Sequence, residues 1–141
     1  MSVRDTILAN LKTGLESISS VKYVTRDLQE YPSKLKQWSP ALFIADDGGE
    51  EINNYCDGDK AQITILILIY GYYHRAEDMT AGFSTFLEAV VDKIYAPISL
   101  GSNVRDCTVV SVNPIVSIPK ENATEFEMHL QIKYWRALGG A

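Results

Sequence analysis

The stretch AQITILILIYGYYHR, residues 61–75, decides the fold of this chain. Every odd position from 63 to 69 is isoleucine, and the even positions add Leu66, Leu68 and Tyr70. Successive side chains of a β-strand point to opposite faces of its sheet. The stretch therefore predicts a strand that is apolar on both faces through its second half, so that both faces need cover.

Covering the second face is a problem for a chain of 141 residues. Helices of the same chain can pack on one face of a sheet, which leaves large apolar side chains bare on the other. Contiguous exposed apolar patches of that kind mark interfaces. We expect either a neighbouring subunit or a hairpin folded back from the same chain to cover this face, and the first of these predicts an oligomer.

Two amphipathic helices are predicted to flank the strands. Apolar residues recur at helical spacing from Val3 to Ile18, and Ser2 or Asp5 can cap the first turn. A second helix begins after Asp78 and ends before Pro97. Its broad apolar face consists of Met79, Phe83, Phe86, Leu87, Val90, Val91 and Ile94.

Strands are predicted at residues 21–25, 41–46, 61–73, 107–118 and 125–135, with a turn-rich acidic loop at 46–60. Pro114 marks a sheet edge or a bulge, because it cannot donate a ladder hydrogen bond. In the last strand the even positions 126–134 are apolar and the odd positions 125–133 are polar. The predicted fold is α+β: a single two-layer domain over residues 1–141, with a mainly antiparallel sheet of four to five strands and two helices packed on one face.

Composition excludes several classes of protein. The net charge of −5 argues against a general nucleic-acid binder, which needs clustered Lys and Arg. The longest apolar run is far shorter than a membrane helix, and no continuous apolar segment forms a signal peptide. We therefore expect a soluble protein that does not enter a membrane. Cys56 and Cys107 are too few for a zinc cluster, and no disulfide between them is expected in a reducing cytosol.

Neither a catalytic group nor a metal or cofactor site is expected. His129 falls on the polar face of the last strand, and His74 follows a strand end. The acidic residues of 46–60 lack the alternate spacing of a calcium loop. A solvated loop is their simplest interpretation, and a surface that faces a partner or repels DNA is the functional one. A small enzyme or ligand-binding domain using His74, Tyr72 and Tyr73 is the alternative from a different class.

The order of the elements carries a resemblance that spans nearly the whole chain. Its parts are the helix VRDTILANLKTGLESI, the strand SPALFIAD, the strand QITILILIYGYY after an acidic loop, the helix DMTAGFSTFLEAVVDKIY and a final strand pair ending in MHLQIKYWRA. This layout resembles the tail terminator (tail completion) proteins of long-tailed bacteriophages. The likeness is one of pattern and not of a sharp motif.

The resemblance implies a structural virion protein with no catalytic residue and no cofactor, assembled in the host bacterial cytoplasm. It implies a ring, usually hexameric, that caps the head-proximal end of the tail tube, stops tube polymerisation and joins the tail to the head. The implied partners are further copies of this chain, the tail tube protein and a head-completion or neck protein. DNA passes through the ring without specific binding. Another neck or tail component, such as a head-closure or tube protein, is the alternative.

Contact or channel-facing residues are expected at three places. They are Asp46, Asp47, Glu50 and Glu51 in the acidic loop, Lys120, Glu121 and Asn122 in the late turn, and Trp135, Arg136 and Leu138 in the C-terminal tail. Exposed Trp and Arg side chains are typical contact anchors, and a place in the core is the other interpretation of Trp135. Loop 46–60 either lines the channel or contacts the tube.

Overall fold

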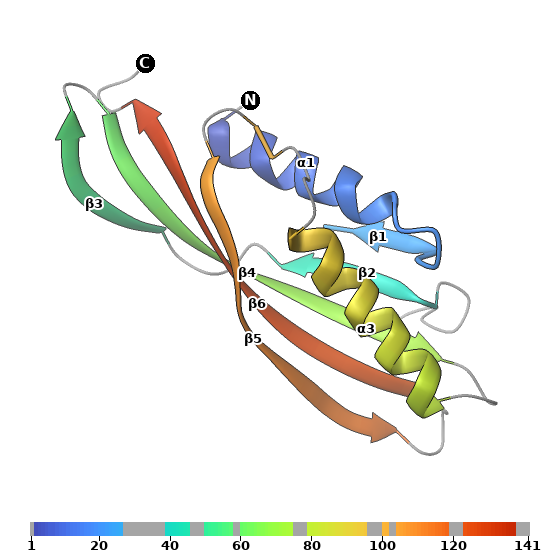
Figure 1. The fold of residues 1–141 in the computed structure, drawn as a ribbon. Coiled ribbons are helices and arrows are strands. Elements are labelled where there is room, and N and C mark those ends of the chain that lie inside the picture. Colours follow the sequence, from blue (N-terminus) through green and yellow to red (C-terminus); the bar gives the residue numbers. More distant parts are fainter. Residues whose placement is uncertain are drawn as a thin grey trace.

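Two helices lie on one face of a six-stranded sheet (Figure 1). The structure is a computed structural model that describes residues 2–26, 39–45, 50–57, 60–74, 79–95, 100–101, 104–118 and 123–137. The elements are α1 (Val3–Glu16), β1 (Tyr23–Thr25), β2 (Ala41–Ala45), β3 (Glu50–Asp57), β4 (Lys60–His74), α3 (Met79–Tyr95), β5 (Val104–Ile118) and β6 (Ala123–Ala137). The predicted α+β class is confirmed, with one strand more than expected.

Strands β4 and β6 form the spine of the sheet. They pair antiparallel over their full length, from Lys60 opposite Ala137 to His74 opposite Ala123. The other edge of β4 is shared, because β3 pairs with its first half and β2 with its second half. The path through the sheet is β1-β2-β4-β6-β5, and β1 and β2 are the one parallel pair among the described strands. The mainly antiparallel sheet is therefore confirmed.

The acidic stretch 46–60 is not a loop throughout, so that prediction was wrong in part. Residues Glu50–Asp57 form β3, in which Glu50 lies opposite Ile65 and Ile52 opposite Ile63. Its sequence, EEINNYCD, has little β propensity of its own. The strand forms because β4 offers it a long β-branched partner, and strand preference depends more on such cross-strand partners than on the local sequence. Asp46 and Asp47 lie outside the described residues.

The core lies between the sheet and the two helices. The odd positions of β4 from 63 to 69 are fully buried, and so are the even positions of β6 from 126 to 134, as the alternation along β6 predicts. They pack against the apolar face of α1, made of Ile7, Leu8, Leu11 and Leu15, and that of α3, made of Phe86, Val90 and Ile94. Burial of this kind stabilises by roughly 25 cal/mol per Å² of apolar surface.

Glycine at position 71 makes room for an aromatic cluster at one end of the core. Gly71 lies opposite Phe126 in the β4–β6 ladder, and a methyl group at Gly71 would overlap the Phe126 ring. The Phe126 ring centroid lies 5.6 Å from that of Phe86, which in turn stacks on Tyr73 at 5.9 Å. The bare backbone of Gly71 thus lets α3 approach the sheet through these rings.

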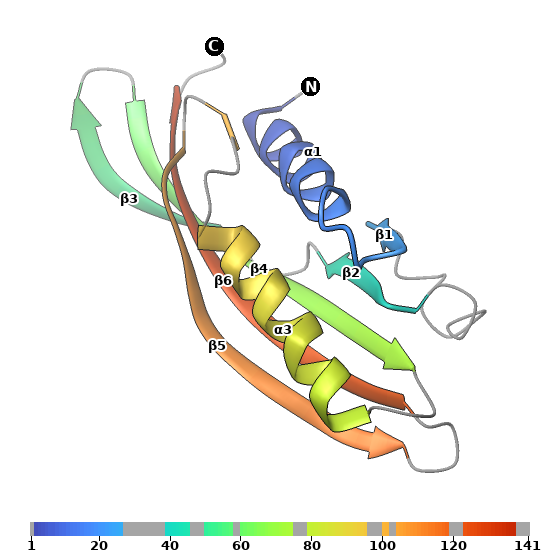
Figure 2. The same cartoon turned by 45° about the vertical axis from the view of Figure 1, so that its right-hand side comes forward.

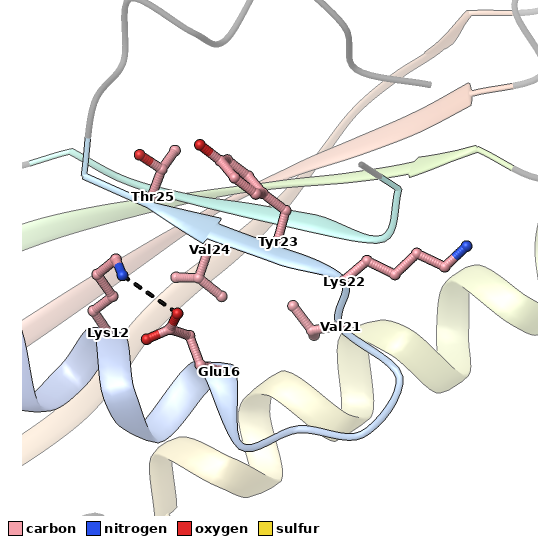
Figure 3. Close-up of a pocket in the computed structure, with 7 residues that line it drawn as sticks. All are labelled: Lys12, Glu16, Val21, Lys22, Tyr23, Val24 and Thr25. Carbon is pink, nitrogen blue, oxygen red and sulfur yellow. Dashed lines mark hydrogen bonds and ion pairs between the residues drawn. The ribbon is translucent and has the colours of Figure 1, made fainter. Parts of the chain in front are cut away.

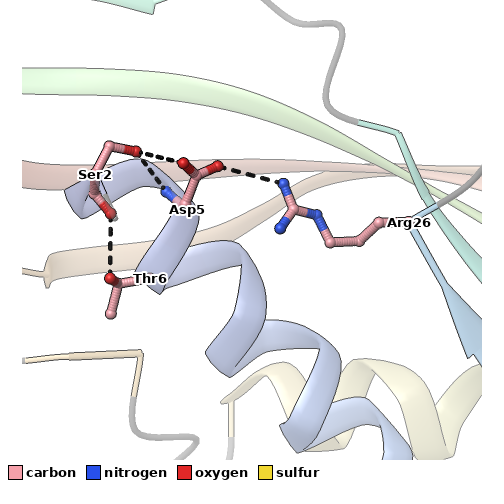
Figure 4. A network of polar contacts seen from close by, with 4 residues as sticks. All are labelled: Ser2, Asp5, Thr6 and Arg26. Atoms are coloured by element: carbon pink, nitrogen blue, oxygen red, sulfur yellow. Dashed lines mark hydrogen bonds and ion pairs between the residues drawn. The ribbon is translucent and has the colours of Figure 1, made fainter.

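Helix α1 begins where the sequence predicts, with Ser2 as its cap (Figure 4). The Asp5 amide donates to Ser2 Oγ at 3.0 Å, and Ser2 Oγ donates to Asp5 Oδ2 at 2.9 Å. This hydrogen bond from Ser2 lowers the pKa of the Asp5 carboxyl, and Arg26, 3.7 Å away, lowers it further. The two contacts tie the start of α1 to the chain just after β1.

Strand β5 begins at Val104, three residues before the predicted start at 107. It pairs with β6 alone among the described strands, and its register slips at three places, one of them just after Pro114 and Ile115. Both alternatives predicted for Pro114, an edge and an irregularity, are therefore found on this strand.

Candidate functional site

The face of β4 that points away from the helices is covered only in part. At one end Tyr72 is fully buried with Ala41 and Phe43 of β2, in a second small apolar cluster that also includes Tyr23 and Tyr70. Toward the middle of the strand Leu68 and Tyr70 are half-buried, and Leu66 is 47% exposed. The chain therefore covers the β2 end of this face by itself and leaves the middle of it open.

Another uncovered apolar side chain lies on β3. Ile52 is 51% exposed, whereas Ile63, its partner on the adjacent strand, is fully buried. Paired residues in a sheet point to the same face, so the cover over this face ends between β4 and β3. Figures 1 and 2 show why, because β3 lies at one end of the molecule, away from both helices. We call β3, together with residues 60–65 of β4, the arm.

Two further large apolar side chains are exposed, on α3 and β5. They are Tyr95, at the end of the helix, and Val110. The Tyr95 hydroxyl accepts a hydrogen bond of 3.0 Å from the Val109 amide, so this ring is held against β5 by its polar tip. Tyr95 therefore has a role within the single chain, in contrast to Ile52 at the far end of the sheet.

Of the acidic residues predicted as contacts, two fall on the arm. Glu51 is an exposed residue of β3, and Glu50 begins the same strand. The local sequence predicts a loop here and assigns no role to Ile52. A single isoleucine within the polar stretch 46–60 was the signal available, because an isolated apolar residue there has no local partner.

The outward face of β6 is polar, as its alternation predicts. His129 Nε2 lies 3.0 Å from Glu127 Oε1, and both side chains are partly exposed. Gln131 of β6 stands opposite Leu66 of β4, so the uncovered leucine borders a polar surface. A partner that binds here would meet a mixed face and not a continuous apolar patch.

The C-terminal residues separate onto the two faces of the sheet. Trp135 is half-buried, with the Arg105 guanidinium 5.8 Å from its ring centroid, a cation–π arrangement that links β5 to β6. Arg136 lies opposite Ala61, and its buried Nε has no hydrogen-bond partner in the described part of the chain. Leu138 and the turn residues Lys120, Glu121 and Asn122 lie outside the described residues.

A cleft of about 360 Å³ lies between the second half of α1 and the short edge strand β1 (Figure 3). Val24 points from β1 toward α1, where Lys12 Nζ and Glu16 Oε2 form an ion pair of 3.3 Å. Lys22 extends away from that pair, and Val21 adds a second apolar side chain. No sequence pattern pointed to this cleft, because it joins two elements by packing alone.

The groups that carry chemistry are scattered. Within the described ranges, no three His, Cys, Asp or Glu side chains are grouped so that they could hold a metal ion. Burial raises the pKa of the Cys107 thiol to about 11, with a smaller contribution from Asp106. His74 is held through its backbone, where its amide donates to Ser39 Oγ at 2.6 Å.

Proteins of known structure resemble this chain over nearly its whole length. One chain in the virion of a native gene transfer agent particle superposes with a TM-score of 0.55 at 14% sequence identity, over 96% of this chain and 92% of that one. This fold is one that a virion protein uses. The gp17 protein of bacteriophage SPP1 superposes with a TM-score of 0.53 at 11% identity, over 98% of this chain and 89% of gp17.

Sequence comparisons add no family assignment. No family model matches the chain, and no curated protein matches it by sequence. None of the described helices is long and apolar enough to cross a membrane. The features of the chain that bear on function are its fold and its uncovered apolar side chains, above all Ile52 on the arm and Leu66 on β4.

Proposed function

We propose that this chain is a structural protein of a phage or phage-like virion, located in the tail or neck, with no catalytic role. The observation that carries the proposal is the likeness of nearly its whole length, 96%, to a chain of a gene transfer agent virion. The finer proposal is that it acts as a tail terminator. Copies of the chain form a hexameric ring at the head-proximal end of the tail tube, where the ring stops polymerisation and joins the tail to the neck.

The uncovered apolar residues support assembly into a ring. Ile52 and Leu66 lie on opposite faces of the sheet, so neighbours that cover them approach one copy from different sides. Head-to-tail contacts between unlike patches generate closed rings when the rotation between copies closes. In a ring of this kind, neighbouring copies cover the apolar side chains that a single copy leaves exposed.

The charge of the chain supports a channel for DNA. A net charge of −5 per copy repels phosphates, and a ring multiplies that charge. DNA that moves through such a ring does not adhere to its wall, in contrast to DNA on a surface rich in Lys and Arg. The partners proposed are therefore other copies of this chain, the tail tube protein and a neck protein, without specific DNA binding.

The test is the assembly state of the purified chain, alone and with tail tubes from the same virion. Size-exclusion chromatography with light scattering and negative-stain imaging should find single rings, alone or on tube ends, and tubes of limited length. A strictly monomeric chain that leaves tube ends bare contradicts the proposal. Long stacked tubes of this chain by itself identify it as a tube subunit.

Histidine variants separate this proposal from an enzyme. His74→Ala and His129→Ala should form rings as the unaltered chain does, because the proposed role requires no imidazole chemistry. Loss of a turnover activity in either variant, with assembly intact, contradicts a purely structural role.

A further inference from the structure

We propose that the Tyr95 hydroxyl closes the outer edge of β5, so that no strand of another copy can pair with it. β5 is the last strand on the path through the sheet, and among the described strands it pairs with β6 alone. Its 15 residues, Val104–Ile118, form the longest open edge of the described sheet. An open edge is a template for strand addition, and natural proteins block such edges by specific devices.

The Tyr95 hydroxyl occupies a backbone amide that an added strand would use. The Val109 amide donates to Tyr95 Oη at 3.0 Å, and this hydrogen bond lies at the surface. In Figures 1 and 2 the last turn of α3, which ends at Tyr95, lies beside β5. The Tyr95 side chain is 59% exposed, so the hydrogen bond explains its position better than burial does.

The proline of β5 shows which way the Val109 amide points. Proline has no amide hydrogen, so in a sheet its nitrogen faces away from the ladder, and the nitrogen of Pro114 faces the open edge. Val109 and Pro114 stand opposite Leu130 and Phe126, which are both even positions of β6. Backbone amides alternate in direction along an antiparallel strand, so the Val109 amide points to the open edge as well.

An exposed valine next to this amide makes the closure necessary. Val110 is the extra residue at the register slip between Val109 and Ser111, and its side chain is 58% exposed. A β-branched residue on an open edge favours pairing with another chain. The slip leaves two evenly paired runs, residues 106–109 and 111–115. Tyr95 takes an outward amide from the first run, and Pro114 removes one from the second.

Closure of this edge directs the contacts between copies to other surfaces. The uncovered side chains Ile52 and Leu66 lie elsewhere, on β3 and β4. The inference goes beyond the proposed function and does not rest on it, because the closed edge is a property of a single copy. It suits an assembly of limited size, since strand addition at an open edge has no built-in end.

Tyr95→Phe tests the contact, because it removes the hydroxyl and keeps the exposed ring. Amide hydrogen exchange at Val109, measured by NMR, should become about fivefold faster or more, as expected for the loss of one hydrogen bond. Ser84→Ala removes an exposed hydroxyl from the same helix and is the matched control, which should leave exchange at Val109 unchanged. Urea denaturation checks that both variants remain folded.

The same variant tests the closure of the edge. Light scattering across a dilution series should find that Tyr95→Phe forms species larger than those of the unaltered chain, and that these grow with concentration. Adding Val110→Lys to Tyr95→Phe places a charge on the freed edge and should abolish the larger species. Val110→Lys by itself should assemble as the unaltered chain does, because this edge takes no part in the normal contacts.

The outcomes separate the contact, the closure and the ring. Unchanged exchange at Val109 in Tyr95→Phe overturns the contact, and faster exchange without larger species overturns its role as a block. Larger species that persist with Val110→Lys associate through another surface and also overturn the closure. Loss of normal assembly in Val110→Lys alone means that copies use this edge, which overturns it too. An unaltered chain that forms no ring contradicts the proposed function and leaves this inference standing.

Discussion

Gly71 shows how a single residue without a side chain sets the distance between helix and sheet. It faces the same side as its neighbours Ile69 and Tyr73, and the Phe126 ring occupies the space where its Cβ would lie. Aromatic rings from β4, β6 and α3 meet over this one position. In the sequence Gly71 reads only as an interruption of the apolar run, since the ring that needs the space lies far along the chain, in the last strand.

We predict that Gly71→Ala lowers the free energy of unfolding by about 1–3 kcal/mol, because overpacking forces Phe126 from its place. Urea denaturation of the purified chain measures the loss. Adding Phe126→Leu to Gly71→Ala should cost less than the sum of the two single changes, because the smaller side chain relieves the overlap. Strict additivity of the two changes would show that the ring and the methyl group do not meet.

Burial also decides the reactivity of Cys107. Because its pKa is raised to about 11, the thiol of the folded chain is protonated at mildly alkaline pH, and the thiolate is the reactive form. In a Cys56→Ser chain, we expect alkylation by iodoacetamide one pH unit below the ordinary thiol pKa of 9.0, followed by mass spectrometry, to be much slower in the folded protein than in urea. Equal rates in the two conditions contradict the burial of this side chain.

The same shift has a consequence for stability. The unfolded thiol loses its proton near its ordinary pKa of 9.0, and the folded thiol near a pKa of about 11. Between these values the unfolded state binds fewer protons, so the contribution of Cys107 to the free energy of unfolding falls as pH rises. Below pH 9.0 the contribution is complete, which places the effect outside the neutral range.

At the scale of the element, strand β4 has two unequal faces. Its odd positions are all buried, most of them under the helices, whereas on its even face Tyr72 is buried and Leu66 is open. The sequence predicted that both faces are apolar and that a single copy covers only one of them fully. The exposed fraction of each side chain was not predictable, because it depends on which strand lies beside β4 at that position.

This inequality predicts different costs for adjacent truncations. Ile67→Ala should lower the free energy of unfolding by about 2–5 kcal/mol, since it opens a cavity in a closed core. Leu66→Ala should cost well under half as much, because Leu66 is 47% exposed in one copy. Both are measured by urea denaturation of dilute protein below the concentration at which copies associate. Similar losses at the two positions would mean that the outer face is as closed as the inner one.

Strand β3 is the element that sequence patterns do not predict. EEINNYCD has neither clear alternation nor strong β propensity, and with its flanks it reads as an acidic loop. Its pairing with residues 60–65 of β4 turns it into the arm and brings Ile52 to the surface. The partner strand in a hairpin provides ladder hydrogen bonds, and these stabilise a strand even where its own β propensity is low.

At the scale of the whole molecule, charge governs contact with nucleic acid. With a net charge of −5, we predict that the chain does not bind double-stranded DNA at physiological salt. Fluorescence anisotropy of a labelled duplex, titrated with the chain as single copies and as rings, checks this. Binding that weakens steeply as salt is added would reveal phosphate contacts and contradict a channel wall that DNA slides past.

The sequence by itself determined the class of the fold, the two helices, the long central strand, the buried face of β6 and the acidic balance. These features follow from local periodicity and composition, which depend only on residues close together in the sequence. Tertiary structure alone decided that β3 exists, that β4 divides one edge between β2 and β3, and that the cleft opens beside β1. Those features come from contacts between residues far apart in the chain. A local sequence pattern does not show which distant segments pair, or which part of a sheet face stays exposed.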